Sequence, residues 1–102
     1  MAKVRKKGNL ILHRKQALNS GLLMERKIWK VPKSNEYPEG VKFRLVLTDP
    51  REHTVLLLYD NHWPKRHHVH VDGREESFEF SSVAELVREF WAKADAIERS
   101  LP

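Results

Sequence analysis

The sequence predicts an α+β fold, an antiparallel sheet of five or six strands packed against one C-terminal amphipathic helix. Short runs of alternating apolar and polar residues, bounded by turn-forming residues, predict the strands. Near the C-terminus, apolar residues recur at steps of three and four, which predicts the helix. The chain has 102 residues, which suits one domain with a single core layer.

The expected strands follow one another through most of the chain. Turn signals separate them, and the clearest is Asp72-Gly73, because Asp-Gly between two short runs favours a hairpin. In the second strand Arg26 interrupts an otherwise apolar face, and a β-bulge would explain that interruption. The strands are expected over residues 10–18, 22–31, 41–48, 54–59, 67–71 and 76–80.

The helix begins with Ser82-Val83-Ala84-Glu85, which has the pattern of a capping box. In this motif the serine oxygen accepts from a backbone N–H, and the glutamate reaches back to the cap. Trp91 lies at the edge of the apolar face, where it suits either the core or an interface. The apolar face, which we expect to cover the sheet as far as about Arg99, consists of Val83, Leu86, Val87, Phe90, Ala94 and Ile97.

The composition excludes several classes of site and of protein. The chain has no cysteine, which rules out disulfides, thiolate metal sites and a cysteine nucleophile. No apolar run approaches the roughly 20 residues of a membrane span, and no signal-peptide pattern follows the basic N-terminus. We therefore expect a cytoplasmic protein with no membrane partner.

Charge is unevenly distributed along the chain, whose net charge is +5. Residues 1–71 hold 15 Lys and Arg against 6 Asp and Glu, whereas residues 72–102 hold 4 against 8. A basic body favours a polyanionic partner such as nucleic acid, although a basic surface also serves solubility alone. We expect residues 1–8 to form a basic flexible arm and residues 9–102 to form a single domain.

Polar residues gather between the fourth expected strand and the last hairpin. Side chains alternate along a strand, so His68 and His70 share one face. His67, Val69 and Val71 share the other face. Because the valines are expected to be buried, His68 and His70 should face solvent or a groove. The cluster comprises Asp60, Asn61, Lys65, Arg66, His67, His68, His70 and Glu76.

This cluster would permit RNA cleavage that needs neither a metal nor a cofactor. One histidine would take the proton of a ribose 2′-hydroxyl, and the other would donate a proton to the leaving 5′-oxygen. Imidazole suits both roles because it titrates near neutral pH. Lys65 or Arg44 would stabilise the charge on the phosphorane, and Asp60 would orient an imidazole. The expected catalytic residues are His68, His70, Lys65 and Asp60.

Three other interpretations of the histidines stay open at this point. His-x-His with a carboxylate is also a metal-ligand arrangement on a strand. The two imidazoles could bind phosphate or base edges without any chemistry. They could also be ordinary surface residues of an edge strand.

Several short motifs occur in order along the chain. They are Ile28-Trp29-Lys30-Val31-Pro32, Lys42-Phe43-Arg44-Leu45-Val46, Tyr59-Asp60-Asn61, Lys65-x-x-His68-x-His70, Arg74-Glu75-Glu76, Phe78-x-Phe80 and the helix through Phe90. Together they resemble the TumE-type toxins of prokaryotic toxin–antitoxin pairs, over about residues 22–95. The resemblance implies a small toxin neutralised by an antitoxin that usually carries a helix-turn-helix domain. It also implies RNA or the translation machinery as the target.

The resemblance carries over to a set of polar positions, with two departures. The loop His62-Trp63-Pro64 is bulkier than the glycine-containing loop expected in the family. His67 stands where an acidic residue is expected, which counts against any scheme that needs a carboxylate there. The matching positions are Arg44, Asp60, Asn61, Lys65, His68, His70 and Glu76. The expected substrate-binding residues are Arg44, Asn61, Arg66 and Glu76.

Two functions from different classes follow from these observations. The first is a ribonuclease toxin that its antitoxin holds silent. The alternative is a non-catalytic module whose basic sheet face docks nucleic acid or a protein partner. The sheet lacks the aromatic ladder of a standard single-strand RNA platform, since Phe43 is expected to be buried. Two further possibilities stay open, namely a homodimer and a partner docked on the sheet edge or at Trp91.

Overall fold

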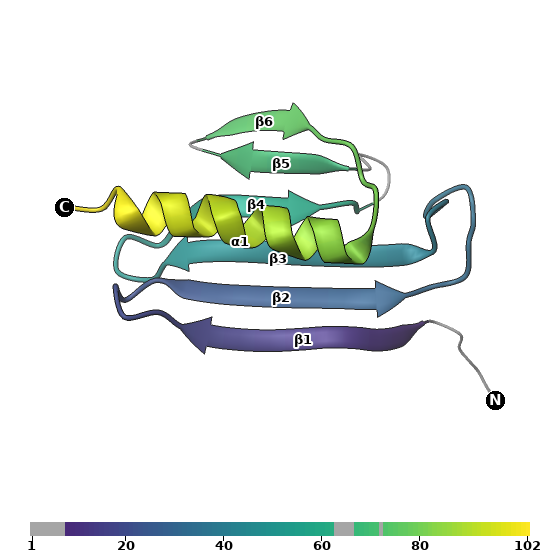
Figure 1. Ribbon diagram of the computed structural model, residues 1–102, viewed down its shortest axis with the longest axis horizontal. Helices are drawn as coiled ribbons and strands as arrows, with labels where there is room; N and C mark the ends of the chain where they lie inside the picture. The colour runs from purple at the N-terminus through teal and green to yellow at the C-terminus, as the bar shows by residue number, and fades with distance from the viewer. Residues whose placement is uncertain (1–7, 63–66, 72) are drawn as a thin grey trace.

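A computed structural model describes residues 8–62, 67–71 and 73–102, so most of the expected basic arm lies outside the described residues. No helix within these ranges has the length and apolar character needed to cross a membrane. The described residues form six strands and one helix (Figure 1). In chain order these are β1 (Asn9–Ala17), β2 (Leu23–Lys30), β3 (Val41–Asp49), β4 (Thr54–Asp60), β5 (His68–Val71), β6 (Arg74–Ser77) and α1 (Val83–Arg99).

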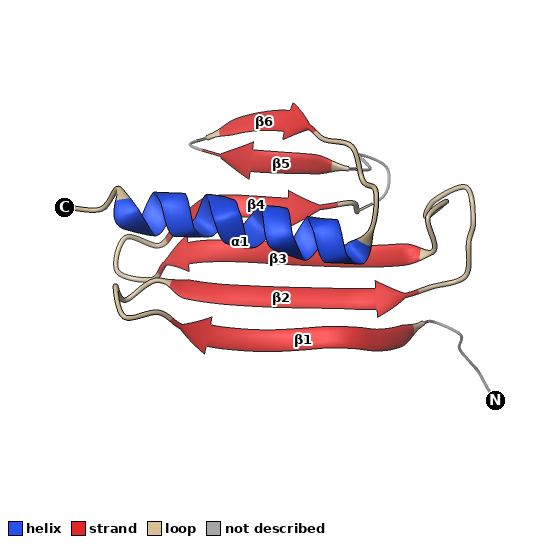
Figure 2. Ribbon diagram, in the orientation of Figure 1, coloured by secondary structure: helices blue, strands red, loops and turns tan. Residues whose placement is uncertain are grey.

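The strands make one antiparallel sheet in which neighbours in the sequence are neighbours in space, in the order β1-β2-β3-β4-β5-β6. Such a meander needs no crossover, because antiparallel strands can be joined by simple turns and loops. The helix α1 lies across one face of this sheet (Figure 2). The expected α+β fold, with five or six strands and one C-terminal helix, is confirmed.

The core lies between α1 and the middle of the sheet. Leu86, Phe90 and Ala94 are the buried positions of the helix, as their spacing predicts. Tyr59 of β4 meets the edge of Phe90 with ring centroids 5.9 Å apart. The Tyr59 hydroxyl donates to Glu89 Oε2 at 2.7 Å, which ties β4 to the helix through a part-buried hydrogen bond.

The start of α1 is fixed by Ser82, whose Oγ accepts from the Glu85 backbone N–H at 3.1 Å. This confirms the expected N-cap. The Glu85 carboxylate pairs with Arg88 on the next turn of the helix, rather than reaching back to the cap as the motif predicts.

The strand β2 is regular, so the expected bulge at Arg26 is wrong. Its pairing with β3 has no register shift, and the irregularity lies in β1, between Leu10 and Leu12. Arg26 stays on the face under α1 with only 8% of its surface exposed. The Trp91 ring covers its guanidinium at 5.1 Å. The sequence of β2 alone shows only that Arg26 is a charged residue in an apolar face. The Trp91 ring that covers it comes from α1.

The last strand begins and ends earlier than residues 76–80 predict. Its pairing starts with Val71 opposite Arg74, and it ends at Ser77. Phe78 and Phe80 lie beyond the strand, in the segment that leads to α1. Their rings pack into the core all the same, Phe78 at 5.1 Å from Tyr59 and Phe80 at 5.8 Å from Phe43 between centroids. Apolar alternation therefore continues past the end of the sheet.

The sheet face opposite α1, called the open face below, carries many charged side chains. Residues that pair across antiparallel strands share a face. The register therefore defines a row that crosses the whole sheet and ends beside the histidines. That row consists of His13, Lys27, Arg44, Asp60, His68 and Ser77.

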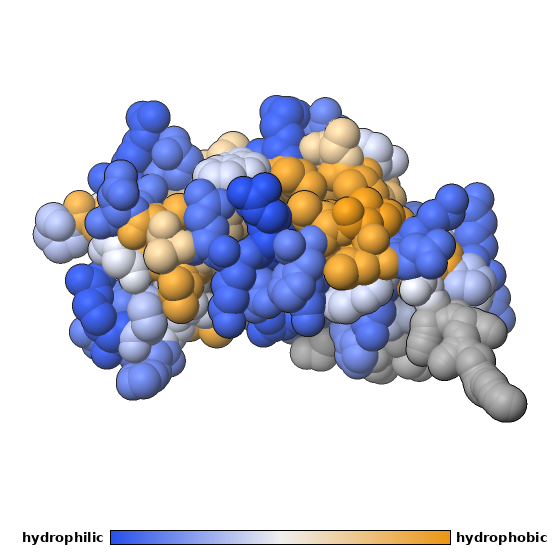
Figure 3. Space-filling view, turned by 90° about the horizontal axis from the view of Figure 1, so that it is seen from below, coloured by the Kyte–Doolittle hydropathy of each residue, from blue (hydrophilic) through white to orange (hydrophobic). Residues whose placement is uncertain are grey.

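One edge of the sheet is formed by β1. Figure 3 views the molecule from this side, where apolar residues gather in a patch bordered by hydrophilic ones. Leu10 and Ile11 of β1 are 55% and 49% exposed. Such an edge presents backbone groups with which a further strand can pair.

Candidate functional site

His68 and His70 occupy alternate positions of β5 and project from the open face. Their ring centroids lie 5.0 Å apart. Val69, between them, is 2% exposed and belongs to the core beneath α1. His68 is buried, with 8% of its surface exposed, whereas His70 is partly exposed, so of the two rings only that of His70 has the expected exposure to solvent. The sequence-based expectation that the two imidazoles share a face, away from the buried valine, is confirmed.

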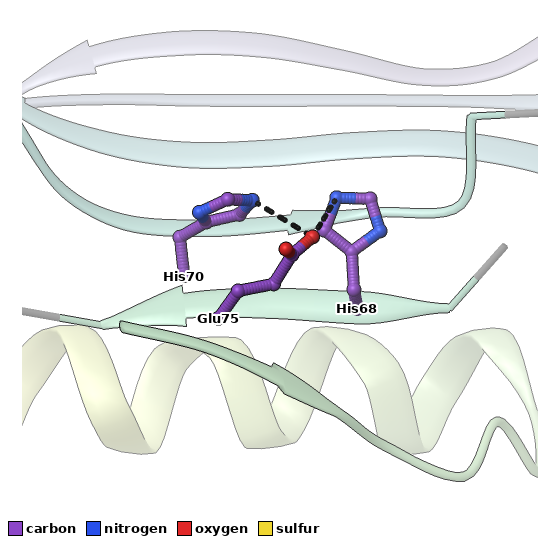
Figure 4. A group of neighbouring side chains, drawn as sticks. All are labelled: His68, His70 and Glu75. Carbon is purple, nitrogen blue, oxygen red and sulfur yellow. Dashed lines mark ion pairs between the residues drawn. The ribbon is translucent and has the colours of Figure 1, made fainter. Parts of the chain in front are cut away.

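Glu75 of β6 places a carboxylate between these two rings (Figure 4). Its Oε2 lies 3.6 Å from His68 Nε2 and 3.5 Å from His70 Nε2. The hairpin register explains this position, since Glu75 pairs directly with His70. The sequence indicates a turn at Asp72-Gly73, and the signal that was missed is the pairing register that such a turn sets. A two-residue turn pairs residue 71 with 74, and therefore residue 70 with 75.

Glu76, which the sequence reasoning selected instead, is separated from the histidines by the sheet. It pairs with Val69, so its side chain emerges on the face that α1 covers. There it accepts a hydrogen bond from Arg74 at 2.9 Å. Strand alternation is the physical reason, since neighbouring residues point to opposite faces. The expected place of Glu76 in the histidine site is corrected to Glu75.

Asp60 and Arg44 lie beside the histidines on the open face. Arg44 pairs with Asp60 across β3 and β4, and Asp60 pairs with His68 across β4 and β5. The expected approach of Asp60 to the histidines therefore follows from strand order. One carboxylate oxygen of Asp60 accepts from the His62 backbone N–H, which holds the side chain at the end of β4.

Asn61, expected to bind substrate, directly follows β4, and its side chain is hydrogen-bonded to β3. It is 2% exposed. Its Oδ1 accepts from the Phe43 N–H at 2.9 Å, and its Nδ2 donates to the Val41 carbonyl at 2.8 Å. The side chain thus forms with β3 the two hydrogen bonds that backbone would form if β4 continued further. These contacts engage both ends of the Asn61 amide, so its expected role in substrate binding stays a prediction that its position does not favour.

His67 lies on the opposite face from His68, as expected. Its ring stacks on Phe43 and Phe80, with centroids 6.0 and 5.5 Å apart. Its Nε2 lies 3.1 Å from Glu39 Oε1. His67 is therefore a packing residue near the end of the core, paired with a carboxylate from the β2–β3 loop.

Lys65 and Arg66 lie outside the described residues, together with Trp63, Pro64 and Asp72. The catalytic role of Lys65 and the substrate contact of Arg66 therefore stay predictions. Both residues precede β5 in the chain, two or three positions before His68.

Trp29 is an aromatic residue of the open face that the sequence reasoning did not assign to the site. Phe43 is buried, as predicted, but Trp29 of β2 lies between two cations. Lys27 Nζ is 5.4 Å and Lys42 Nζ 5.7 Å from its ring centroid. Counting alternate positions from buried Ile28 would have placed Trp29 on this face. Cations and an aromatic ring together are typical of surfaces that bind single-stranded nucleic acid.

The family model described as Toxin TumE matches residues 4–101, which is nearly the whole chain. Comparisons with curated proteins and with solved structures give no match.

Proposed function

The chain belongs to the TumE family and is thus the toxin component of a toxin–antitoxin system, and we propose that it cleaves RNA in the cytoplasm. The observation that carries this proposal is the meeting of His68, His70 and Glu75 on the open face. The two imidazole centroids are 5.0 Å apart, and one carboxylate oxygen lies within 3.6 Å of both Nε2 atoms. Two imidazoles at this spacing can reach one phosphodiester from two sides.

The proposed reaction is attack of a ribose 2′-oxygen on the adjacent phosphorus, without a metal. One imidazole accepts the proton of the 2′-hydroxyl, and the other donates a proton to the departing 5′-oxygen. The P–O2′ bond forms as the P–O5′ bond breaks, which leaves a 2′,3′-cyclic phosphate and a 5′-hydroxyl. Glu75 stabilises whichever imidazole carries the positive charge and fixes its orientation.

Cations on the open face support RNA as the substrate. Lys27 pairs with Arg44, so two cations lie side by side on the open face, and Asp60 stands between Arg44 and His68. Arg44 is exposed, and its guanidinium suits the non-bridging oxygens of a phosphate. Lys65 and Arg66, close to His68 in the sequence, would add to this charge. Trp29 offers a surface on which a base can stack.

The family implies an antitoxin as the protein partner. We propose that this antitoxin carries a helix-turn-helix domain and silences the toxin by covering the open face with acidic side chains. Charge complementarity with Lys27, Lys42 and Arg44 supports that mode of binding. RNA would then be excluded from His68 and His70 for as long as the complex lasts.

A non-catalytic RNA-binding module is the second candidate, because Trp29 between Lys27 and Lys42 needs no chemistry to bind a strand. The two candidates differ in what the histidines do. For a binding module, His68→Ala and His70→Ala would change RNA affinity only modestly. For a nuclease, the same two substitutions would abolish the RNA cleavage product while RNA binding persists.

The test is incubation of the purified protein with single-stranded RNA in the presence of a chelator. We expect cleavage by the wild type and a loss of at least about a hundredfold in rate for His68→Ala and for His70→Ala. The matched control is His53→Asn in the β3–β4 turn, where the positive φ of 54° suits asparagine. Intact RNA with every protein, or equal rates for wild type and both histidine variants, would refute the proposed nuclease.

A further inference from the structure

We propose that His68, His70 and Glu75 also form a three-ligand site for a zinc-type transition-metal ion, and that an ion bound there silences RNA cleavage. The silencing rests on the proposed function of the histidines. Metal binding itself does not, because it depends only on the three side chains and their spacing. The hairpin would then be both the site of proton transfer and the place where a metal ion regulates it.

The ligand atoms already converge. One nitrogen from each imidazole and one carboxylate oxygen all lie within 4.8 Å of one another. The Glu75 Oε2 distances to the two Nε2 atoms are 3.6 and 3.5 Å. Ligands at about 2.0–2.2 Å from a tetrahedral zinc ion are roughly 3.3 Å apart. Two of the three ligand–ligand distances are therefore close to that spacing, and rotation of the imidazoles would shorten the third.

Chemistry favours zinc over the common hard cations. Two imidazoles with one carboxylate form a known ligand set for zinc, which leaves a fourth position for water. Magnesium and calcium prefer oxygen ligands throughout, so this site should discriminate against them. The 3.5 and 3.6 Å distances are those of ion pairs, and they are also close to the separation of two ligands that share one cation.

The scaffold holds the ligands in register. All three come from the β5–β6 hairpin, where His70 and Glu75 are directly paired and His68 is two residues before His70. The neighbouring strand β4 pairs along the whole of β5, which limits twisting of the hairpin. A site whose ligands are held in this way loses little conformational entropy when the ion binds.

Silencing follows from the lone pairs of the imidazoles. A nitrogen bound to zinc can neither accept the 2′-hydroxyl proton nor carry a proton to the 5′-oxygen. The proposed cleavage needs both steps, and both histidines are ligands. A chelator should therefore restore activity without refolding the protein.

Binding is tested by isothermal titration of tag-free protein with zinc chloride. We expect one site in the wild type, and at least roughly tenfold weaker binding for His68→Ala, His70→Ala and Glu75→Gln. Glu76→Gln is the matched control, because the neighbouring carboxylate points to the other face and its removal should leave zinc affinity unchanged. Magnesium chloride should give no binding. Wild-type affinity in Glu75→Gln, or no zinc binding by wild type, would overturn the site.

Silencing is tested separately by cleavage assays in chelator and in one equivalent of zinc. We expect zinc to suppress cleavage and excess chelator to restore it. Faster cleavage with zinc than with chelator would refute silencing and make the ion a cofactor. Cleavage under neither condition would refute the proposed nuclease, and with it the silencing, while the titration would still decide whether the metal site exists.

Discussion

His70 and Glu75 face each other across the β5–β6 hairpin, with His70 Nε2 3.5 Å from Glu75 Oε2. The same oxygen lies 3.6 Å from His68 Nε2, so one carboxylate serves both rings. A strand pair fixes this contact more tightly than a loop would, because each residue is held by the sheet. The arrangement supports the proposed role of Glu75 in positioning both imidazoles.

Replacing Glu75 by Gln should lower RNA cleavage by about tenfold or more, because the neutral amide cannot stabilise an imidazolium. The fold should survive, since the Glu75 side chain is 41% exposed. The measurement is the single-turnover rate with circular dichroism as a folding check. Glu76→Gln supplies the control, and an equal decrease in both variants would contradict the role given to Glu75.

Arg44→Gln should weaken RNA binding without altering the fold. Each phosphate that the protein no longer neutralises reduces the slope of log affinity against log salt by roughly 0.7 for a single strand. Fluorescence anisotropy across a salt series measures that slope. Arg99→Gln, at the far end of α1 where Arg99 pairs with Asp95, is the control and should keep the wild-type slope. A wild-type slope in Arg44→Gln would remove Arg44 from the RNA surface.

Asn61→Ala should destabilise the protein by about 1–3 kcal/mol, because it leaves the Phe43 N–H and the Val41 carbonyl without their partner. Urea unfolding measures the change. RNA affinity per folded molecule should stay at the wild-type value. A stable variant with weakened RNA binding would restore Asn61 to the substrate-binding group.

Stability at high pH should depend on Tyr59. Burial, and then the hydrogen bond to Glu89, raise the pKa of the Tyr59 hydroxyl well above its ordinary value. Above about pH 10 an unfolded tyrosine loses its proton while Tyr59 in the folded protein keeps it. The unfolded state then binds fewer protons, so stability falls as pH rises.

Tyr59→Phe removes that pH dependence. It should cost about 1 kcal/mol near neutral pH because the hydrogen bond to Glu89 is absent, and its stability should fall less than wild type between about pH 9 and pH 11. Urea unfolding across this range gives the comparison, with Tyr37→Phe as the control. Parallel pH curves for wild type and Tyr59→Phe would contradict the buried, proton-retaining phenol.

The fold was largely predictable because its signals are local. The Ser82 cap and the apolar spacing through Ala94 define α1 without reference to the sheet. The turn after Val71 likewise defines the last hairpin. The end of β6 was not predictable from alternation, since Phe78 and Phe80 pack into the core after the strand has ended.

The site was predictable only in part. Alternation alone places His68 and His70 together, but choosing Glu75 over Glu76 needs the pairing register across the turn. The role of Asn61 depends on backbone atoms of Phe43, 18 positions away in the chain. Contacts between distant segments of this kind leave no periodic trace in a sequence.

The proposed nuclease depends on His68 and His70 acting together in the attack by a ribose 2′-hydroxyl. The most direct measurement is end-group analysis of RNA cut by the purified protein in chelator, beside a matched strand carrying 2′-deoxyribose at the cut site. We expect 2′,3′-cyclic phosphate and 5′-hydroxyl ends from the RNA, and an intact deoxy-substituted strand. Cleavage of the substituted strand, or products ending in 5′-phosphate, would contradict the roles proposed for His68 and His70.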